Sequence, residues 1–175
     1  TTGTTAYGVT FTSSNNNQII NTTLNIPLAS DVYSNAANNN SIINSIFNRS
    51  DLGFTGTGSW IQVQWYVDVN VTDGAAGIAD AAVNITNVTS GLVFDGITDA
   101  SGTIAQQTLT EFWKNSTVTV YSTPHNIYAS KAGLSNSALV NLTETNSTTI
   151  VLTLAQVANT NITNCTTIST SNTYT

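Results

Sequence analysis

Asparagine followed two positions later by serine or threonine is the chemically specific spacing that recurs along this chain. This spacing is the acceptor for N-linked glycans, which attach to the asparagine side chain. With 23 Asn and 50 Ser or Thr in 175 residues, random order gives about six or seven such sites, so the observed eleven are a modest excess. The candidate N-glycosylation sites are Asn21, Asn39, Asn48, Asn70, Asn84, Asn87, Asn115, Asn141, Asn146, Asn161 and Asn164.

The chain is also very poor in charged residues. Asp, Glu, Lys and Arg make up 7% of it, against about 25% in an average soluble domain. Three basic residues at a net charge of −6 exclude an electrostatic surface for nucleic acid or anionic lipid. Because charge normally keeps a surface soluble, this surface must be covered by sugars or by neighbouring subunits. The sequons and the low charge together predict a secreted glycoprotein.

Nine carboxylates, one histidine and one cysteine leave little for a catalytic site. His125 follows Pro124 at the expected start of a strand, where we predict a solvent-exposed turn residue and no catalytic partner. A metal site of the His/Cys type is excluded by count, so we predict no cofactor apart from N-linked glycans. Asp95 and Asp99 are either weak calcium ligands or turn residues that bond the local backbone. Cys165 is either a free thiol or pairs between chains.

Aromatic side chains are candidates for a platform on which a sugar stacks. Trp65 lies on the apolar face of an expected strand, so we predict that it packs in the core. Trp113 is the better candidate for exposure. The other members of this aromatic set are Trp60, Tyr66 and Tyr121.

Alternation of apolar and polar residues predicts the elements that position these groups. From residue 60 to 74, six alternate apolar side chains share one face and end at an Asp-Gly turn, which is the strongest strand signal in the chain. Short apolar runs separated by turn residues continue to residue 157. We therefore predict an all-β fold, an Ig-like or transthyretin-like β-sandwich of about seven or more strands. With no apolar run of 18 residues, we predict no membrane-spanning segment.

The sequence divides into three regions. Residues 1–58 form an N-terminal extension, 59–157 the sandwich, and 158–175 a polar C-terminal tail or edge strand. Within the extension, the spacing of Ile42, Ile43, Ile46 and Phe47 predicts a short helix near 41–48. Alternation over residues 5–12 predicts a strand there.

The order of motifs between about residues 60 and 155 resembles the carboxypeptidase regulatory-like domain, a small transthyretin-like β-sandwich of archaeal cell-surface proteins. The resemblance implies a structural module without catalysis. As a whole, the chain resembles glycosylated subunits of archaeal extracellular filaments and sheaths. The matching residues are Gly77, Ala82, Val83, Ile85, Thr98, Asp99, Gly102, Ala129, Lys131 and Gly133.

The strand over residues 5–12 has two interpretations. Its apolar row, Tyr7, Val9 and Phe11, gains several kcal/mol on burial at about 25 cal/mol/Å², so the strand must pair somewhere. It either closes its own domain or is donated to the sheet of the next subunit, as in β-augmentation. Donation repeated without closure makes a filament.

We favour donation, because the strand begins the chain, its tether is polar and the surface is poor in charge. The predicted function is a non-enzymatic structural subunit of an extracellular filament, thread or sheath at the cell surface. Its partners are identical subunits, with other cells or surfaces as further partners. The lack of methionine predicts a processed N-terminus. The alternatives are an adhesin or carbohydrate-binding module of a larger surface protein and, third, a component of an S-layer-like lattice.

Overall fold

The structure is a computed structural model that describes residues 7–26, 30–143 and 148–153. Over these residues it contains thirteen strands and one short 3-10 helix, η1 (Arg49–Asp51), which confirms the all-β class. The strands are β1 (Val9–Thr12), β2 (Gln18–Ile20), β3 (Val32–Asn35), β4 (Asn40–Ile43), β5 (Leu52–Thr55), β6 (Ile61–Thr72), β7 (Ala82–Thr86), β8 (Leu92–Ile97), β9 (Gln107–Lys114), β10 (Thr119–Tyr121), β11 (His125–Lys131), β12 (Leu134–Val140) and β13 (Thr148–Thr153).

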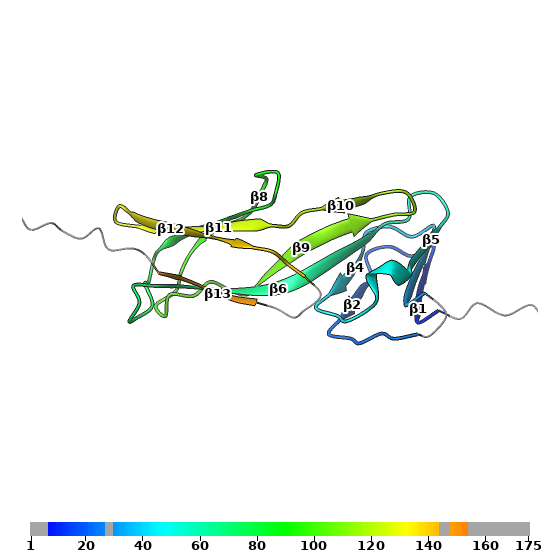
Figure 1. The fold of residues 1–175 in the computed structure, drawn as a ribbon, viewed down its shortest axis with the longest axis horizontal. Coiled ribbons are helices and arrows are strands. Elements are labelled where there is room, and N and C mark those ends of the chain that lie inside the picture. Colours follow the sequence, from blue (N-terminus) through cyan, green and yellow to red (C-terminus); the bar gives the residue numbers. More distant parts are fainter. Residues whose placement is uncertain (1–6, 27–29, 144–147, 154–175) are drawn as a thin grey trace, which may run out of the picture.

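The strands form three sheets. The first is parallel, in the order β1-β3-β5, and the second has the order β10-β9-β6-β4-β2, with β13 also paired to β6. The third is antiparallel, in the order β12-β11-β7-β8. Figure 1 shows β11 and β12 over β6, β9 and β13 at one end of the elongated molecule, and β1 to β5 at the other.

The first five strands and the start of β6 wind as a unit that we call the parallel coil. The chain alternates between two sheets, with β1, β3 and β5 in one and β2, β4 and β6 in the other, all parallel. Successive turns stack on one another as in a β-solenoid. Since β6 also pairs with β9, the coil and the sandwich share one strand.

A repeat of 23 residues underlies the coil, and strand and helix periodicities do not reveal it. The letters NNNQIIN at residues 15–21 recur as NNNSIIN at residues 38–44. In the structure these segments lie side by side, with Ile19 opposite Ile42. Self-similarity at a fixed spacing is the sequence signature of stacked turns, so the signal was present in the sequence.

Asparagines at equal positions of the first two turns bond to each other, and we call these contacts the asparagine ladder. The Asn44 Nδ2 donates to the Asn21 Oδ1 at 2.9 Å, and the Asn39 Nδ2 donates to the Asn16 Oδ1. All four residues have φ between 45° and 61°, a left-handed region that asparagine tolerates better than most residues. Asparagine therefore forms the corner and links the turns.

Asn40 is the buried member of this ladder. Its Oδ1 accepts hydrogen bonds from the backbone nitrogen and the Nδ2 of Asn17, at 2.8 and 3.0 Å. Its Nδ2 donates to the Ser14 carbonyl at 3.0 Å. A buried amide is tolerated here because both of its ends are bonded.

The predicted helix near 41–48 is wrong. Residues 40–43 form β4 instead, and Asn44 follows with a φ of 45°. All four residues of β4 are buried, because its sheet is covered on both faces. A short apolar run fits a helix or a buried parallel strand equally well, and the neighbouring β2 and β6 decide in favour of the strand.

The alternation in β6 is confirmed along its whole length. Ile61, Val63, Trp65, Val67, Val69 and Val71 are each at most 2% exposed, while the residues between them are partly exposed. The turn after β8 also follows the expected chemistry, since Gly102 has a φ of 82°. A side chain at Gly77 would meet the Ser101 carbonyl at 1.8 Å, so this close approach requires glycine.

We expect Asn40→Ala to lower the free energy of unfolding by about 2–4 kcal/mol, because it removes the three hydrogen bonds that the buried Asn40 amide makes with Asn17 and Ser14. Urea unfolding followed by circular dichroism measures this change. Asn38→Ala is the matched control, since its exposed side chain makes no hydrogen bond with the described residues, and should cost within about 0.5 kcal/mol. Equal effects of the two substitutions would contradict a structural role for the ladder.

Candidate functional site

The first strand lies on its own chain in the structure. β1 pairs in parallel with β3, and Phe11 is 6% exposed within the hydrophobic core. Val9 packs against that core, and the Tyr7 ring stacks on Tyr33 with 4.2 Å between centroids. Residues 5 and 6 of the predicted strand lie outside the described residues.

β1 is an edge strand. Among the described strands it pairs with β3 alone, and β2 pairs with β4 alone. The first turn of the coil thus presents two strand edges whose outer backbone groups have no partner strand in the described part of the chain. Such edges are the surfaces on which β-strand addition occurs.

Three candidate glycosylation sites have the same local geometry. In Asn48, Asn87 and Asn115, the Oδ1 accepts hydrogen bonds from the backbone nitrogen and the hydroxyl of the Ser or Thr two residues on. Each sequon is therefore folded as a compact turn at the surface. This geometry leaves the asparagine nitrogen on the outside of the turn at Asn115, whose Nδ2 makes no hydrogen bond with the described residues.

The remaining described sequons differ in setting. Asn21 and Asn39 belong to the ladder, and Asn84 donates to Asp95 at 2.7 Å. Asn70 lies within β6, and its buried Oδ1 has no partner among the described residues. Asn141 accepts a hydrogen bond from Thr123 at 3.1 Å. Asn146, Asn161 and Asn164, like Cys165, lie outside the described residues.

The carboxylates of the acidic turn residues accept hydrogen bonds from nearby backbone nitrogens and hydroxyl groups. Both carboxylate oxygens of Asp99 accept hydrogen bonds from Ser101 and Thr103, and these bonds lower the pKa of Asp99 well below its usual value. Backbone hydrogen bonds from Ala76 and Ala75 lower the pKa of Asp73 in the same way. In the described ranges no three His, Cys, Asp or Glu side chains come together as a metal site.

His125 is buried, so the expected exposed turn residue is a wrong prediction. It begins β11 opposite Val140, and 1% of its surface is exposed. Its Nδ1 has no hydrogen-bond partner in the described part of the chain. Burial disfavours the charged imidazolium and lowers the pKa of His125. Alternation along β11 carries this signal, because His125 shares the buried face of the strand with Ile127 and Ala129.

A β-bulge in β9 brings Glu111 into the interior. The register passes from Val63 opposite Phe112 to Gln64 opposite Thr110, so Glu111 is the extra residue. As a result both Glu111 and Phe112 face inward, with 6% and 2% of their surfaces exposed. A bulge re-aims the side chains that follow it.

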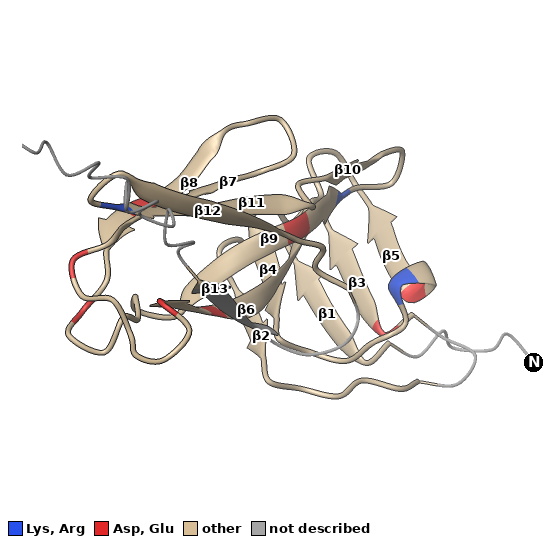
Figure 2. Ribbon diagram, turned by 60° about the vertical axis from the view of Figure 1, so that its left-hand side comes forward, with Lys and Arg blue, Asp and Glu red and all other residues tan. Residues whose placement is uncertain are grey.

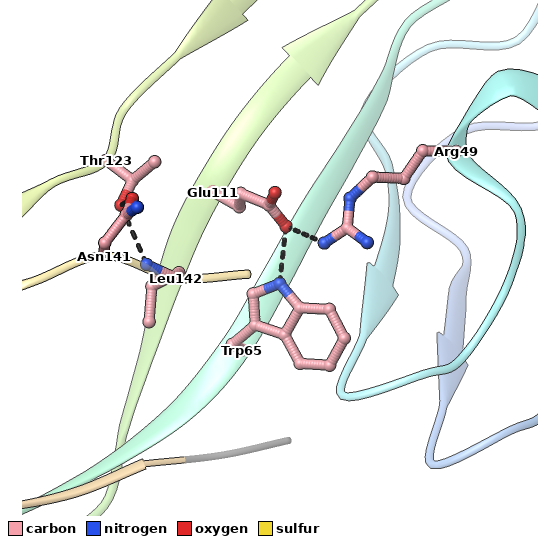
Figure 3. Close-up of polar contacts among 6 residues, drawn as sticks. All are labelled: Arg49, Trp65, Glu111, Thr123, Asn141 and Leu142. Carbon is pink, nitrogen blue, oxygen red and sulfur yellow. Dashed lines mark hydrogen bonds and ion pairs between the residues drawn. The ribbon is translucent and has the colours of Figure 1, made fainter. Parts of the chain in front are cut away.

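Glu111 ties the coil to the sandwich (Figure 3). Its Oε2 accepts a hydrogen bond from the Trp65 indole at 2.7 Å. The same oxygen forms an ion pair with Arg49, the first residue of η1. The Arg49 guanidinium lies 5.6–5.9 Å from the ring centroids of Phe47, Trp65 and Phe112. The carboxylate is therefore paired and hydrogen-bonded, and the guanidinium that pairs with it lies over aromatic rings. Trp65 is 2% exposed, as its expected core position requires.

Two tryptophans, Trp60 and Trp113, line a groove of about 600 Å³. Trp60 precedes β6, and Trp113 lies on β9 between Gln62 and Val120 of the flanking strands. Both indoles are partly exposed. The groove's lining residues are Asn38, Asn39, Gly58, Trp60, Trp113 and Val120.

The other two aromatics of the predicted platform lie elsewhere. Tyr121 is 57% exposed and packs its ring edge-on against Phe112, with 5.7 Å between centroids. Tyr66 lines a separate polar pocket with Asn44 and Gln106. Of the five aromatics, the structure therefore brings together Trp60 and Trp113.

Comparisons with known proteins identify no family. No model of a protein family matches the chain, and no curated protein matches it. Among solved structures, the chain is similar to the Bacillus anthracis TIE protein, with 13% sequence identity and a TM-score of 0.34 over 61% of this chain. The match covers 20% of that protein, so this chain spans about a fifth of its length. In the described residues, no helix is both long and apolar enough to cross a membrane.

We expect Glu111→Leu to cost about 3–5 kcal/mol of unfolding free energy, because it leaves the partly buried Arg49 without its counter-charge and the buried Trp65 indole without its acceptor. Glu111→Gln keeps an acceptor for the Trp65 indole and should cost less. Asp80→Asn is the matched control, because it removes an exposed carboxylate at a φ of 50° that asparagine also adopts. Denaturant unfolding measures the three variants, and a Glu111→Leu cost below that of Glu111→Gln would refute the proposed role of the ion pair.

Protonation of His125 should couple stability to pH. The pKa in the unfolded chain is near 6.5 and burial lowers it in the fold, so the unfolded state binds more protons between these two values. The free energy of unfolding is therefore highest above pH 6.5 and declines below it, by at most about 1.4 kcal/mol per pH unit.

Unfolding curves between pH 7.5 and pH 5 test this coupling, since the carboxylates mostly titrate below that range. The His125→Gln variant should lose this slope, because His125 is the one histidine of the chain. An unchanged slope in the variant would show that another group is responsible.

Proposed function

We propose that this chain is a non-enzymatic structural subunit of an extracellular glycoprotein filament, thread or sheath at the cell surface. In this proposal Tyr7, Val9 and Phe11 are the assembly residues, and the strand that carries them is exchanged between neighbouring copies. The observation that carries the proposal is the position of β1 at a sheet edge, with one partner strand, a buried Phe11 and a partly buried Val9 on one face.

Exchange of β1 preserves its contacts. A β1 from a neighbouring copy makes the same hydrogen bonds with β3 and buries the same Phe11 ring, so the exchange conserves most of the contact energy. The change is confined to the connection between β1 and β2, where Ser13 and Asn16 have positive φ. A head-to-tail exchange whose rotation does not close into a ring makes an open chain of subunits, and this is the geometry we propose.

The surface chemistry supports a covered, assembled state. Figure 2 shows long stretches of ribbon without charged residues, and the carboxylates lie mainly in loops and at strand ends. Side-by-side packing of such surfaces carries no cost of burying charges. The compact sequon turns at Asn48, Asn87 and Asn115 favour N-linked glycans as the solubilising groups between contacts.

We also propose that the sandwich is of the Ig-like or transthyretin-like type, as in carboxypeptidase regulatory-like domains. The antiparallel order β12-β11-β7-β8 over the β6–β9 pair supports this assignment. The motif residues Gly77 and Gly102 meet in the turn region, and Lys131 donates to the Ala79 carbonyl. In such a module these residues have structural roles.

Cross-linking in register tests the exchange. Thr12 lies opposite Asn35 in the β1–β3 pair, so Thr12→Cys with Asn35→Cys, in a Cys165→Ser background, places two thiols across that pair. Oxidised filaments should give a covalent ladder on a non-reducing gel if β1 is donated. Monomers with an internal disulfide would overturn donation, and Thr12→Cys alone is the control for random cross-links.

Assembly itself is tested by a pair of charge substitutions. Phe11→Asp should abolish filaments in negative-stain electron microscopy, because it places a carboxylate in the buried row, whereas Thr10→Asp on the exposed face should leave them intact. Circular dichroism of both variants shows whether the fold persists. Absence of filaments in the unmodified native material would overturn the structural function.

A further inference from the structure

The groove between Trp60 and Trp113 plays no part in the proposed assembly, and its construction is specific. Trp113 faces out because the bulge at Glu111 shifts the alternation of β9 by one residue. Without the bulge, Trp113 would share the inward face of Leu109, which is fully buried. A distortion of the sheet therefore places a second large indole beside Trp60.

Both indoles stay partly exposed in a protein that buries its third tryptophan almost completely. Val120, which lies opposite Trp113 on β10, is 50% exposed. When a ligand covers an exposed apolar surface of this kind, apolar area leaves water and the free energy of the system falls. Flat indole faces carry partial negative charge, so they attract the partly positive C–H groups of a ligand laid against them.

The rim of the groove supplies polar groups on a rigid turn. The Asn38 backbone nitrogen donates to the Asn15 Oδ1 at 2.8 Å, and the Asn39 Nδ2 donates to Asn16. These ladder contacts hold the turn in place. The Asn38 side-chain amide makes no hydrogen bond with the described residues, so it offers one donor group and one acceptor to a ligand.

The charge of the lining selects the class of ligand. None of the lining residues is charged, and the nearby Lys114 donates to the Arg49 carbonyl on the opposite face. A neutral groove with two indoles, an amide and a volume of about 600 Å³ matches a neutral ligand with apolar C–H faces and hydroxyl groups. That is the chemistry of an uncharged sugar.

We propose that the Trp60–Trp113 groove is a binding site for a neutral saccharide. Such a ligand has two sources. One is a free or foreign oligosaccharide, and the other is a glycan attached to Asn39, whose sequon ends at Ser41 and whose side chain lines the groove. β1 contributes no residue to the lining of the groove, so strand exchange reaches the groove only through the contacts of Asn15 and Asn16 with its rim.

The first arm of the test uses the full-length Ser41→Ala protein, which removes the sequon but keeps the Asn39 amide. Tryptophan fluorescence and isothermal titration calorimetry follow the addition of N,N′-diacetylchitobiose and mannobiose. We expect saturable binding that weakens at least tenfold in Trp113→Ala and is partly restored in Trp113→Phe. Tyr128→Ala, an exposed aromatic on β11 away from the groove, is the matched control and should bind normally.

The second arm identifies the source. Acrylamide quenching of tryptophan fluorescence is compared between the native glycosylated protein and the Ser41→Ala protein. Stronger protection in the native protein, together with free sugar binding only to Ser41→Ala, assigns the groove to the glycan of Asn39. If quenching is equal in the two proteins and both of them bind the added sugar, the groove is assigned to a free saccharide. The proposal would be overturned if the Ser41→Ala protein shows no saturable binding while quenching is equal in the two proteins. It would also be overturned if binding survives in Trp113→Ala.

Discussion

The pairing of β6 with β9, interrupted by one bulge at Glu111, is the constraint on which the rest of the structure depends. β6 is long enough to pair with β4 at its start and with β13 at its end, so it joins the parallel coil to the sandwich. The bulge then turns Glu111 inward to Arg49 and Trp113 outward to the groove. One extra residue in a strand thus decides both the internal ion pair and the exposed aromatic surface.

Neutral polar side chains link the turns of the coil, and the few charged side chains bond within the chain. All three basic residues bond to the interior of the chain, Arg49 to Glu111, Lys114 to the Arg49 carbonyl and Lys131 to the Ala79 carbonyl. The asparagine ladder links the turns of the coil through neutral amides. Neutral amides bond without the large desolvation cost of ions, so they are compatible with the covered surface of the proposed assembly.

Local sequence patterns predicted the elements whose two faces differ. The alternation of β6 and the turn at Gly102 could be read from the sequence, because strand periodicity and positive φ leave direct marks on residue types. The parallel coil was not predicted, although the segments NNNQIIN and NNNSIIN carry its 23-residue repeat. The helix expected near 41–48 was wrong because β4 is buried on both faces and has no alternation to show.

The sequence by itself determined the all-β class, the apolar face of β6, the core position of Trp65 and the scarcity of charge, since each depends on neighbouring residues or on composition. Only the tertiary structure decided that Glu111 occupies a bulge and that Trp60 meets Trp113. These features arise from register between strands distant in the chain. A shift of register by one residue exchanges the two faces of a strand, and such a shift leaves no trace in the local pattern.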